Sequence, residues 1–188
     1  MRIISGNFKG KKILLPKDKL TRPLKDLTKE SIFNIIKHSK LLDIELKNSN
    51  ILDLFSGIGS FGLECLSRGA ASVTFLESYK EVLIVLKKNI ANLKQQNNSN
   101  IIETDIFAEK TLKLLNNKFE IIFMDPPYKE KKLEDLLNTI IELKLLKDNG
   151  IIIIHRHKKE EDIFPNEFNT IIKKNYGISK IIFGNTQS

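Results

Sequence analysis

The residues best suited to chemistry form the run Asp125-Pro126-Pro127-Tyr128. The prolines fix φ and remove two backbone donors, which predicts a rigid turn whose carbonyls stay free to accept hydrogen bonds. The carboxylate and the Pro126 carbonyl could together accept from a flat NH2 group, while Tyr128 offers a ring face for stacking. This pattern predicts a site for a planar exocyclic amine, such as that of a nucleobase. The alternative is a tight Pro-Pro turn with Asp125 as a solvated strand end.

A glycine-rich loop earlier in the chain is a candidate cofactor site. Gly57, Gly59 and Gly62 have the spacing of a dinucleotide-binding loop, and Glu77 follows about 20 residues on. Glycines there let the backbone approach a ligand closely. Glu77 could bind the ribose hydroxyls of either NAD or S-adenosylmethionine. Asp53, just before the glycines, favours S-adenosylmethionine, because a carboxylate repels a pyrophosphate and attracts an ammonium group.

Asp105 follows the next predicted strand and has two interpretations of equal weight. It could accept a hydrogen bond from an adenine amine, or it could cap a helix over residues 108–115. The glycine spacing alone is weak evidence for a cofactor site. The glycines combined with acids at successive strand ends, and with the Asp-Pro-Pro-Tyr run, make a strong indication.

The elements that must position these residues alternate between strands and helices. Apolar runs predict strands at 51–55, 73–77, 101–103, 121–125 and 151–154, with a final antiparallel pair at 168–172 and 180–183. Helical periodicity predicts helices at about 26–39, 61–68, 81–93, 108–115 and 133–145. Because several strands are apolar throughout, we expect an α/β fold with a parallel sheet covered on both faces. Ahead of it, residues 2–15 predict a short β-hairpin with a basic turn.

Charge is unevenly distributed along the 188 residues, whose formal net charge is +8. Residues 1–50 contain 12 Lys or Arg against 5 Asp or Glu, and the remaining 138 contain 19 against 18. A basic extension at 1–49 on a nearly neutral core at 50–188 indicates a single domain that binds a polyanion, with nucleic acid favoured. The alternative is a compositional bias toward lysine, which does not explain why the surplus lies at one end.

Several classes of protein and site are disfavoured. No apolar stretch approaches the roughly 20 residues of a membrane span, and the N-terminus has no signal-peptide pattern, so we expect a cytoplasmic protein. The lone Cys65 excludes an internal disulfide and a cysteine zinc site, and we interpret it as a core residue. His155-Arg156-His157 could suggest a metal site, but with no third ligand in sight we expect no metal and a solvated or RNA-facing strand end.

These motifs resemble the bacterial RsmD family, the 16S ribosomal RNA guanine-N2 methyltransferases that use S-adenosylmethionine. The resemblance covers residues 2–184, nearly the whole chain. It rests on the Asp-Pro-Pro-Tyr loop and on these further segments: Arg2-Ile3-Ile4-Ser5-Gly6, Gly10-Lys11-Lys12, Thr21-Arg22-Pro23, Lys29-Glu30-Ser31-Ile32-Phe33-Asn34, and the loop and helix from Asp53 to Ala70. The Asp-Pro-Pro-Tyr loop also occurs in adenine-N6 DNA methyltransferases, so the N-terminal pattern makes the assignment more specific.

The resemblance implies a Rossmann-like class I methyltransferase with a mostly parallel seven-stranded sheet and an antiparallel C-terminal strand. It implies transfer of a methyl group to a guanine N2 amine of rRNA, or of a small-subunit assembly particle. We expect the protein to be a monomer. The expected catalytic residues are Asp125, Pro126, Pro127 and Tyr128. The expected cofactor-binding residues are Asp53, Phe55, Gly57, Gly59, Gly62, Glu77, Asp105 and Arg22. The expected RNA-binding residues are Arg2, Lys9, Lys11, Lys12, Arg22, Lys25 and Lys29.

The chain departs from the family pattern at three positions. Leu27 and Lys29 stand where the family usually has arginines, and Arg and Lys differ in how they bind phosphate. His155 follows a strand that in the family usually ends in glutamate. The rival hypotheses are an adenine-N6 DNA methyltransferase, a non-catalytic RNA-binding module on the same fold, and an NAD-dependent oxidoreductase. The last lacks any visible hydride-transfer site, and 188 residues leave little room for a DNA target-recognition region.

Overall fold

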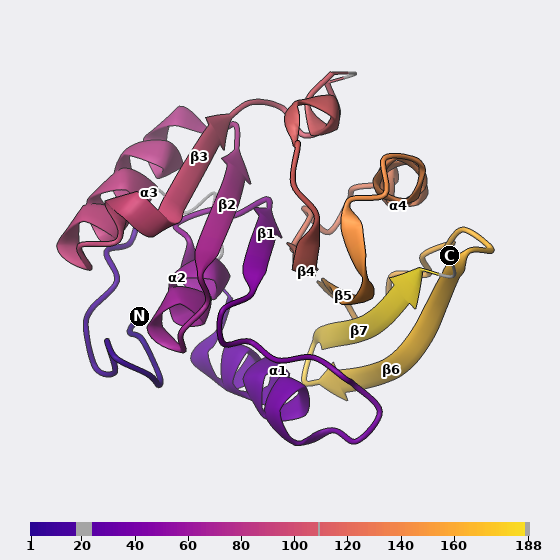
Figure 1. The fold of residues 1–188 in the computed structure, drawn as a ribbon, viewed down its shortest axis with the longest axis horizontal. Coiled ribbons are helices and arrows are strands. Elements are labelled where there is room, and N and C mark those ends of the chain that lie inside the picture. Colours follow the sequence, from indigo (N-terminus) through magenta and orange to yellow (C-terminus); the bar gives the residue numbers. More distant parts are fainter. Residues whose placement is uncertain (18–23, 109, 187–188) are drawn as a thin grey trace.

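The computed structural model describes residues 1–17, 24–108 and 110–186, and it is built around a seven-stranded sheet (Figure 1). The strands are β1 Asn50–Leu54, β2 Ser72–Glu77, β3 Ser99–Glu103, β4 Phe119–Met124, β5 Leu146–His157, β6 Phe168–Tyr176 and β7 Ser179–Thr186. The helices are α1 Asp26–His38, α2 Ser60–Ser67, α3 Lys80–Asn92 and α4 Leu133–Glu142, with short 3-10 turns η1 Gln96–Asn98 and η2 Leu112–Leu114.

The order of the strands creates a place for a ligand. The sheet runs β3-β2-β1-β4-β5-β7-β6, parallel from β3 to β5, with β7 antiparallel to both of its neighbours. The chain moves outward from β1 through β2 to β3 and then returns to β4, on the other side of β1. Such a reversal leaves a crevice outside the carboxyl ends of the strands. The predicted Rossmann-like fold with an antiparallel C-terminal strand is confirmed.

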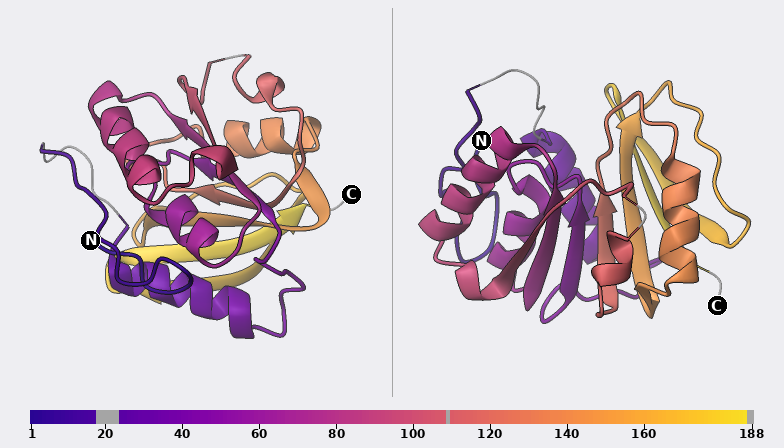
Figure 2. Two further views of the ribbon diagram at one scale, coloured as in Figure 1. Left: turned by 60° about the vertical axis from the view of Figure 1, so that its left-hand side comes forward. Right: turned by 90° about the horizontal axis from the view of Figure 1, so that it is seen from above.

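Apolar side chains that alternate along the strands build a core on each face of the sheet. Figure 2 shows the helices in layers against the sheet. Ile51, Phe75 and Phe123 belong to the cluster that also contains the buried faces of α1, α2 and α3. Leu52 and Ile122, one residue along their strands, belong to the cluster beneath α4 and η2. The near-continuous apolar strands of the sequence are therefore buried on both sides, as predicted.

The N-terminal extension packs against the core. Its predicted hairpin is short: Arg2 and Lys12 form an isolated antiparallel bridge, with backbone hydrogen bonds from Ile3 N to Lys11 O at 2.9 Å and from Ile13 N to Met1 O at 3.0 Å. The side chains of Ile3 and Ile13 are fully buried in the same cluster as α1 and α2. We therefore propose that extension and core form one folding unit.

One predicted helix is absent. Residues 108 and 110–115, the described part of that range, form bends, turns and the 3-10 turn η2 in place of an α-helix. Local side-chain bonds compete with the helix here, because the Thr111 hydroxyl donates to Asp105 O at 2.7 Å and lies 3.1 Å from the Thr104 hydroxyl.

No helix in the described part of the chain is both long and apolar enough to span a membrane.

Candidate active site

A cavity of about 690 Å³ lies at the carboxyl ends of the parallel strands, where the strand order reverses. It is lined by the ends of β1, β2, β4 and β5, by the loops after β1, β2, β3 and β4, by the start of α2, and by Leu24 before α1. The sequence-predicted residues among its lining are Asp53, Phe55, Gly57, Glu77, Asp105, Asp125, Pro126, Pro127 and Tyr128. Residues spread over 76 positions of sequence are thus brought to one site. Gly59, just before α2, and Gly62, in its first turn, lie outside this lining, and Arg22 lies outside the described residues.

The glycine loop has the backbone shape that its sequence indicated. Phe55 and Gly57 have φ angles of 60° and 55°, in the left-handed region that glycine tolerates best. A Cβ added at Gly57 would meet no atom within 4 Å, so its backbone faces open space. Gly62, in contrast, lies in the first turn of α2 with no room for a side chain, because a Cβ there would lie 2.4 Å from Cε1 of Phe75 on β2. The loop thus exposes its backbone while α2 presses against the sheet.

Glu77 holds this loop in place at the end of β2. Its Oε2 accepts a hydrogen bond from Gly57 N at 2.8 Å, and its Oε1 accepts from Ser78 N at 2.8 Å and Tyr79 N at 2.9 Å. Charge-assisted bonds of this kind are stronger than neutral ones. The carboxylate is therefore fixed at the cavity wall, with unused lone pairs for a ligand's hydroxyl groups.

Asp53 is a buried carboxyl group at the end of β1, with 1% of its surface exposed. Its Oδ2 accepts a hydrogen bond at 3.0 Å from the backbone N of Gly62, which lies in the first turn of α2. The pKa of Asp53 is raised to about 8, mainly by burial and to a lesser degree by the charges of Asp125 and Glu77, while the Gly62 hydrogen bond opposes the shift. Such a group favours a cationic ligand, because a nearby positive charge stabilises its ionised form.

Asp105 lies in a turn after β3. Its Oδ1 accepts from Phe107 N at 3.0 Å, an Asx-type turn. The interpretation as the cap of an α-helix over residues 108–115 is wrong, since that helix does not form. The ring of Phe107 lies 5.8 Å from that of Phe55, and both rings line the cavity.

The Asp-Pro-Pro-Tyr loop is held in place by hydrogen bonds from a side chain of the neighbouring strand β5. Arg156, which is 1% exposed, donates from Nη1 to Pro127 O at 3.0 Å and from Nη2 to Glu130 O at 2.9 Å. Its Nε donates to Asp162 at 2.8 Å, and Lys180 pairs with the other oxygen of Asp162 at 3.2 Å. The expectation that the prolyl carbonyls stay free is therefore wrong for Pro127, whose oxygen binds Arg156.

His155 is a site residue that sequence reasoning missed. It is 6% exposed, lines the cavity, and its Nδ1 lies 2.8 Å from Asp125 Oδ1. The prediction of a solvated or RNA-facing strand end is wrong here, since Ser179 and Asp125 cover the ring. Strand pairing contained the signal: Phe123 pairs with Ile153, so residues two further along, Asp125 and His155, become neighbours on one face.

Apart from Arg22, which lies outside the described residues, the predicted RNA-binding residues divide into two groups. The exposed ones are Arg2, Lys9, Lys11, Lys12 and Lys25. Lys29 is fully buried, where its Nζ donates to Arg2 O at 2.9 Å and lies 3.6 Å from Glu64 Oε2 and 3.7 Å from Asp26 Oδ1. Burial lowers the pKa of Lys29, although both carboxylates oppose the shift. The prediction that Lys29 contacts RNA is therefore wrong.

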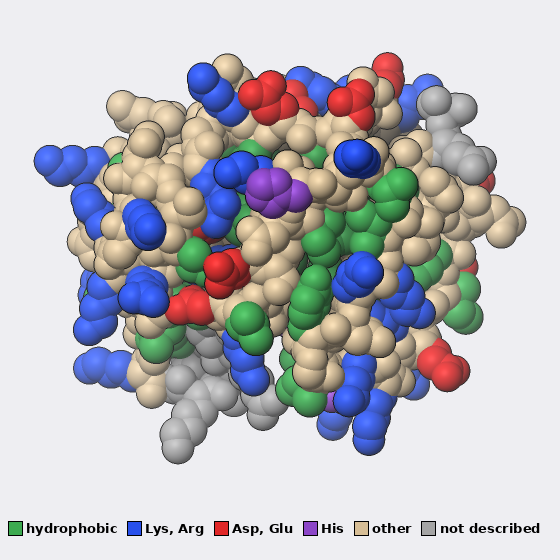
Figure 3. All heavy atoms as spheres, turned by 90° about the horizontal axis from the view of Figure 1, so that it is seen from below, with side chains coloured by type: hydrophobic (Ala, Val, Ile, Leu, Met, Phe, Trp, Pro, Cys, Tyr) green, Lys and Arg blue, Asp and Glu red, His purple; other side chains and the backbone are tan. Residues whose placement is uncertain are grey.

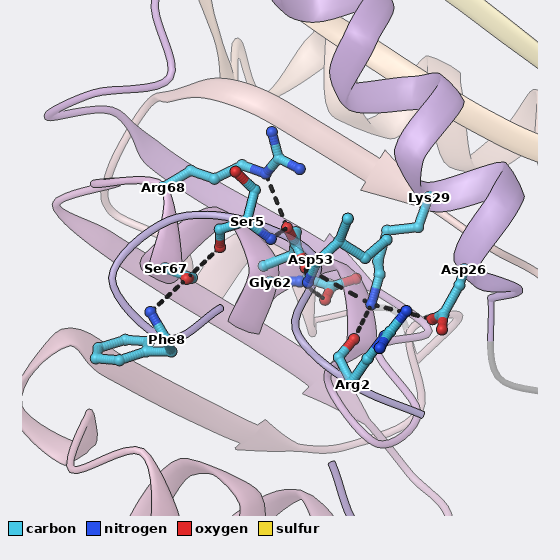
Figure 4. Close-up of polar contacts among 11 residues, drawn as sticks. Arg2, Ser5, Phe8, Asp26, Lys29, Asp53, Gly62, Ser67 and Arg68 are labelled. Atoms are coloured by element: carbon cyan, nitrogen blue, oxygen red, sulfur yellow. Dashed lines mark hydrogen bonds and ion pairs between the residues drawn. The ribbon is translucent and has the colours of Figure 1, made fainter. Parts of the chain in front are cut away.

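Figure 4 shows what this buried charge does instead: it helps to fasten the N-terminal extension to α2. Glu64 accepts from Ile4 N at 2.8 Å and from Ser5 N at 2.9 Å, and Arg68 Nε donates to the same carboxylate at 2.9 Å. One turn on, Ser67 donates its hydroxyl to Ser5 O at 2.6 Å and accepts from Phe8 N at 2.9 Å. The extension is thereby joined to the helix that begins at the glycine loop.

No group of three His, Cys, Asp or Glu side chains in the described ranges has the arrangement of a metal site. The single cysteine, Cys65, is buried in α2 within the hydrophobic cluster. Burial raises the pKa of its thiol well above the ordinary value, which makes it a poor nucleophile.

Comparison with known proteins gives consistent matches over the full length. A family model described as conserved hypothetical protein 95 matches residues 1–185. A protein named ribosomal RNA small subunit methyltransferase D from Buchnera aphidicola is 37% identical over 176 residues, which cover 92% of this chain and 85% of that protein. Its namesake in Haemophilus influenzae is 32% identical over 183 residues, covering 95% and 90%. The solved structure of yhhF from Escherichia coli, a protein provisionally named a methyltransferase, superposes with a TM-score of 0.81. The two sequences are 27% identical, and the match covers 100% of this chain and 98% of that chain.

Proposed function

The chain belongs to the RsmD family of S-adenosylmethionine-dependent methyltransferases, and we propose that it methylates the N2 amine of a guanine in 16S ribosomal RNA. The names of the relatives support an rRNA substrate, because they describe ribosomal RNA small subunit methyltransferases. The choice of guanine N2 rests on the N-terminal motifs of the sequence and on the amine-binding loop. An rRNA substrate in turn supports action in the cytoplasm.

The cavity fits S-adenosylmethionine by its shape and by its charge. Gly57 presents open backbone to it, and Asp53, Glu77 and Asp125 bring carboxylates together that a cationic ligand would stabilise. We propose that Asp53 binds the ammonium group, Glu77 the ribose hydroxyls and Asp105 the adenine amine. When bound, the cofactor supplies a methyl group on a sulfonium, which is a good leaving group. The protein's main task is then alignment of the reactants.

Asp125 and Tyr128 are proposed to prepare the nucleobase amine. The lone pair of that nitrogen is spread into the ring, so the amine is a poor nucleophile. Hydrogen bonds from the NH2 group to the Asp125 carboxylate and the Pro126 carbonyl would localise the lone pair and stabilise positive charge that develops on the nitrogen. Stacking of the extruded base on Tyr128 would contribute about 1–3 kcal/mol.

One observation supports this proposal above the others: the amine-accepting residues line the same cavity as the cofactor-type acids. Asp125 and Tyr128 share it with Asp53, Glu77 and Asp105, although the five residues come from separate parts of the chain. A solvated strand end or a simple turn would not need this convergence. Transfer between two bound molecules does need it, because the methyl donor and the amine must meet.

Basic side chains outside the cavity are proposed to bind the RNA backbone. Arg2, Lys9, Lys11, Lys12 and Lys25 are exposed on or next to the extension. In Figure 3, Lys and Arg side chains are spread over the face shown, with no single compact patch. Phosphate contacts of this kind supply much of the affinity for nucleic acid and weaken as salt rises. We therefore expect rRNA binding to fall steeply with salt concentration.

The test is methyl transfer from labelled S-adenosylmethionine to small-subunit particles, bare 16S rRNA and duplex DNA. We expect label on rRNA or on the particle, and loss of transfer with retained cofactor binding in Asp125→Ala. Asp135→Ala is the matched control, because Asp135 is an exposed carboxylate on α4, away from the cavity lining. Label on DNA adenine, or cofactor binding with no transfer to any substrate, would overturn the proposal.

A further inference from the structure

The Asp125 carboxylate is the end of a chain of three side chains. Nδ1 of His155 lies 2.8 Å from Asp125 Oδ1, and Nε2 of the same ring lies 2.9 Å from Ser179 Oγ. The three residues come from the end of β4, from β5 and from β7. His155 and Ser179 are each 6% exposed, and the side chain of Asp125 is 22% exposed. Both nitrogens of the ring are therefore fixed in direction.

The hydrogen bonds among these three side chains fix the tautomer of the His155 ring when the ring is neutral. An ionised carboxylate can only accept, so Nδ1 must carry a proton that it donates to Asp125. Nε2 of the neutral ring then accepts from the Ser179 hydroxyl, which can equally turn to accept if the ring is doubly protonated. The Asp125 contact therefore persists in either protonation state of the ring.

The three hydrogen-bonded side chains differ from the Ser-His-Asp arrangement of hydrolases in which end of the series faces the substrate. There the serine faces the substrate and the aspartate lies behind the histidine. Here Asp125 and His155 line the cavity and Ser179 does not. Of the two end groups, only the carboxylate therefore reaches the cavity, and Ser179 serves to hold the imidazole.

The surroundings explain why Asp125 needs such support. Asp53 is a second carboxyl group in the same cavity, and the charge of Asp125 contributes to its raised pKa. On the other side, the Tyr128 ring lies edge-on to His155 at 6.4 Å and to His157 at 5.2 Å. A donor on Oδ1 offsets the repulsion between the acids and prevents the carboxylate from rotating.

We propose that His155 is the positioning residue of methyl transfer: it binds Oδ1 of Asp125 and directs Oδ2 toward the substrate amine. This inference rests on the proposed function and adds a residue to it. His155 itself takes no part in bond making, and it acts through the carboxylate. Ser179 completes the arrangement by fixing the far side of the ring.

Three variants test the inference kinetically. His155→Leu removes both hydrogen bonds, and we expect kcat to fall about 10- to 100-fold while the Kd for S-adenosylmethionine stays unchanged. His155→Asn retains a donor at the δ position, so it should recover most of the lost kcat. His38→Asn, the same change at an exposed histidine at the end of α1, is the control. Unchanged kcat in His155→Leu, or an Asn variant as slow as the Leu variant, would overturn the inference.

A spectroscopic measurement tests the contact without any activity. The chain has only three histidines, which makes long-range proton–nitrogen NMR of their rings tractable. We expect His155 to be protonated at Nδ1 in the wild type and to lose that preference in Asp125→Ala. A neutral ring protonated at Nε2 in the wild type would refute the inference. If the wild type methylates no nucleic acid, the proposed function fails while this NMR result still stands; if it does and His155→Leu is equally fast, only the inference fails.

Discussion

Replacing Asp53 by Asn should make the free protein more stable and the cofactor complex weaker. The pKa of Asp53 is raised from 3.8 to about 8, mainly by burial. A carboxyl group with a raised folded-state pKa keeps its proton at pH values where the unfolded chain has lost it. The free energy of unfolding of the wild type therefore falls as pH rises from about 4 to about 8. Asn cannot ionise, so Asp53→Asn escapes this loss.

The size of the effect follows from the pKa. Each tenfold change in proton affinity corresponds to about 1.4 kcal/mol, so the gain of the variant above pH 8 is at most about 6 kcal/mol. Polarisable surroundings reduce that ceiling, and we expect at least about 2 kcal/mol at pH 8.5 and no difference near pH 4. Loss of a charged partner for the ammonium group should weaken cofactor binding about 10- to 100-fold.

Urea unfolding at pH 4, 6 and 8.5 measures the first effect, and isothermal titration of S-adenosylmethionine at pH 7 measures the second. Titration in buffers of different ionisation enthalpy should also show proton release by the wild type, because the bound cation stabilises the ionised carboxylate, and no such release by the variant. A variant that is no more stable than the wild type at pH 8.5, or that binds the cofactor equally well, would refute this reasoning.

Three further substitutions probe the supporting structure. Gly62→Ala places a Cβ 2.4 Å from the Phe75 ring, and thermal unfolding should show a loss of about 1–3 kcal/mol. Arg156→Met removes the two donors to the amine-binding loop, so steady-state kinetics should show kcat reduced about tenfold or more with cofactor affinity retained; equal kcat would contradict this role of Arg156. Glu64→Gln removes the buried carboxylate that pairs with Lys29 and leaves only the partly exposed Asp26 beside it, so urea unfolding should show a loss of about 3–5 kcal/mol; an unchanged midpoint would contradict that role.

Most of the sheet could be predicted because the strands β1, β2, β4, β5 and β7 are largely buried, whereas the edge strands β3 and β6 are more exposed. Runs such as Ile151 to Ile154 leave little choice of structure, and the strand bounds agree to within a few residues at most ends. The helix expected at residues 108–115 could not be excluded from periodicity alone. It is lost to hydrogen bonds of the Thr111 hydroxyl, which depend on how the chain turns after β3.

The candidate site was predictable where chemistry is local in sequence and hidden where it depends on neighbouring strands. Asp53 and Asp125 each follow an apolar run that marks a strand end. His155 looked like part of a solvated strand end, because only the register between β4 and β5 brings it to Asp125. Lys29 looked like an RNA contact, because nothing local to it reveals the buried carboxylate of Glu64 35 residues away.

The most direct test of the central claim is the identity of the methylated nucleoside. 16S rRNA or small-subunit particles would be labelled by the purified protein, digested to nucleosides and resolved by mass spectrometry. We expect N2-methylguanosine as the labelled product, absent when Asp125→Ala replaces the wild type. Label in N6-methyladenosine, or in any position other than a guanine exocyclic amine, would contradict it.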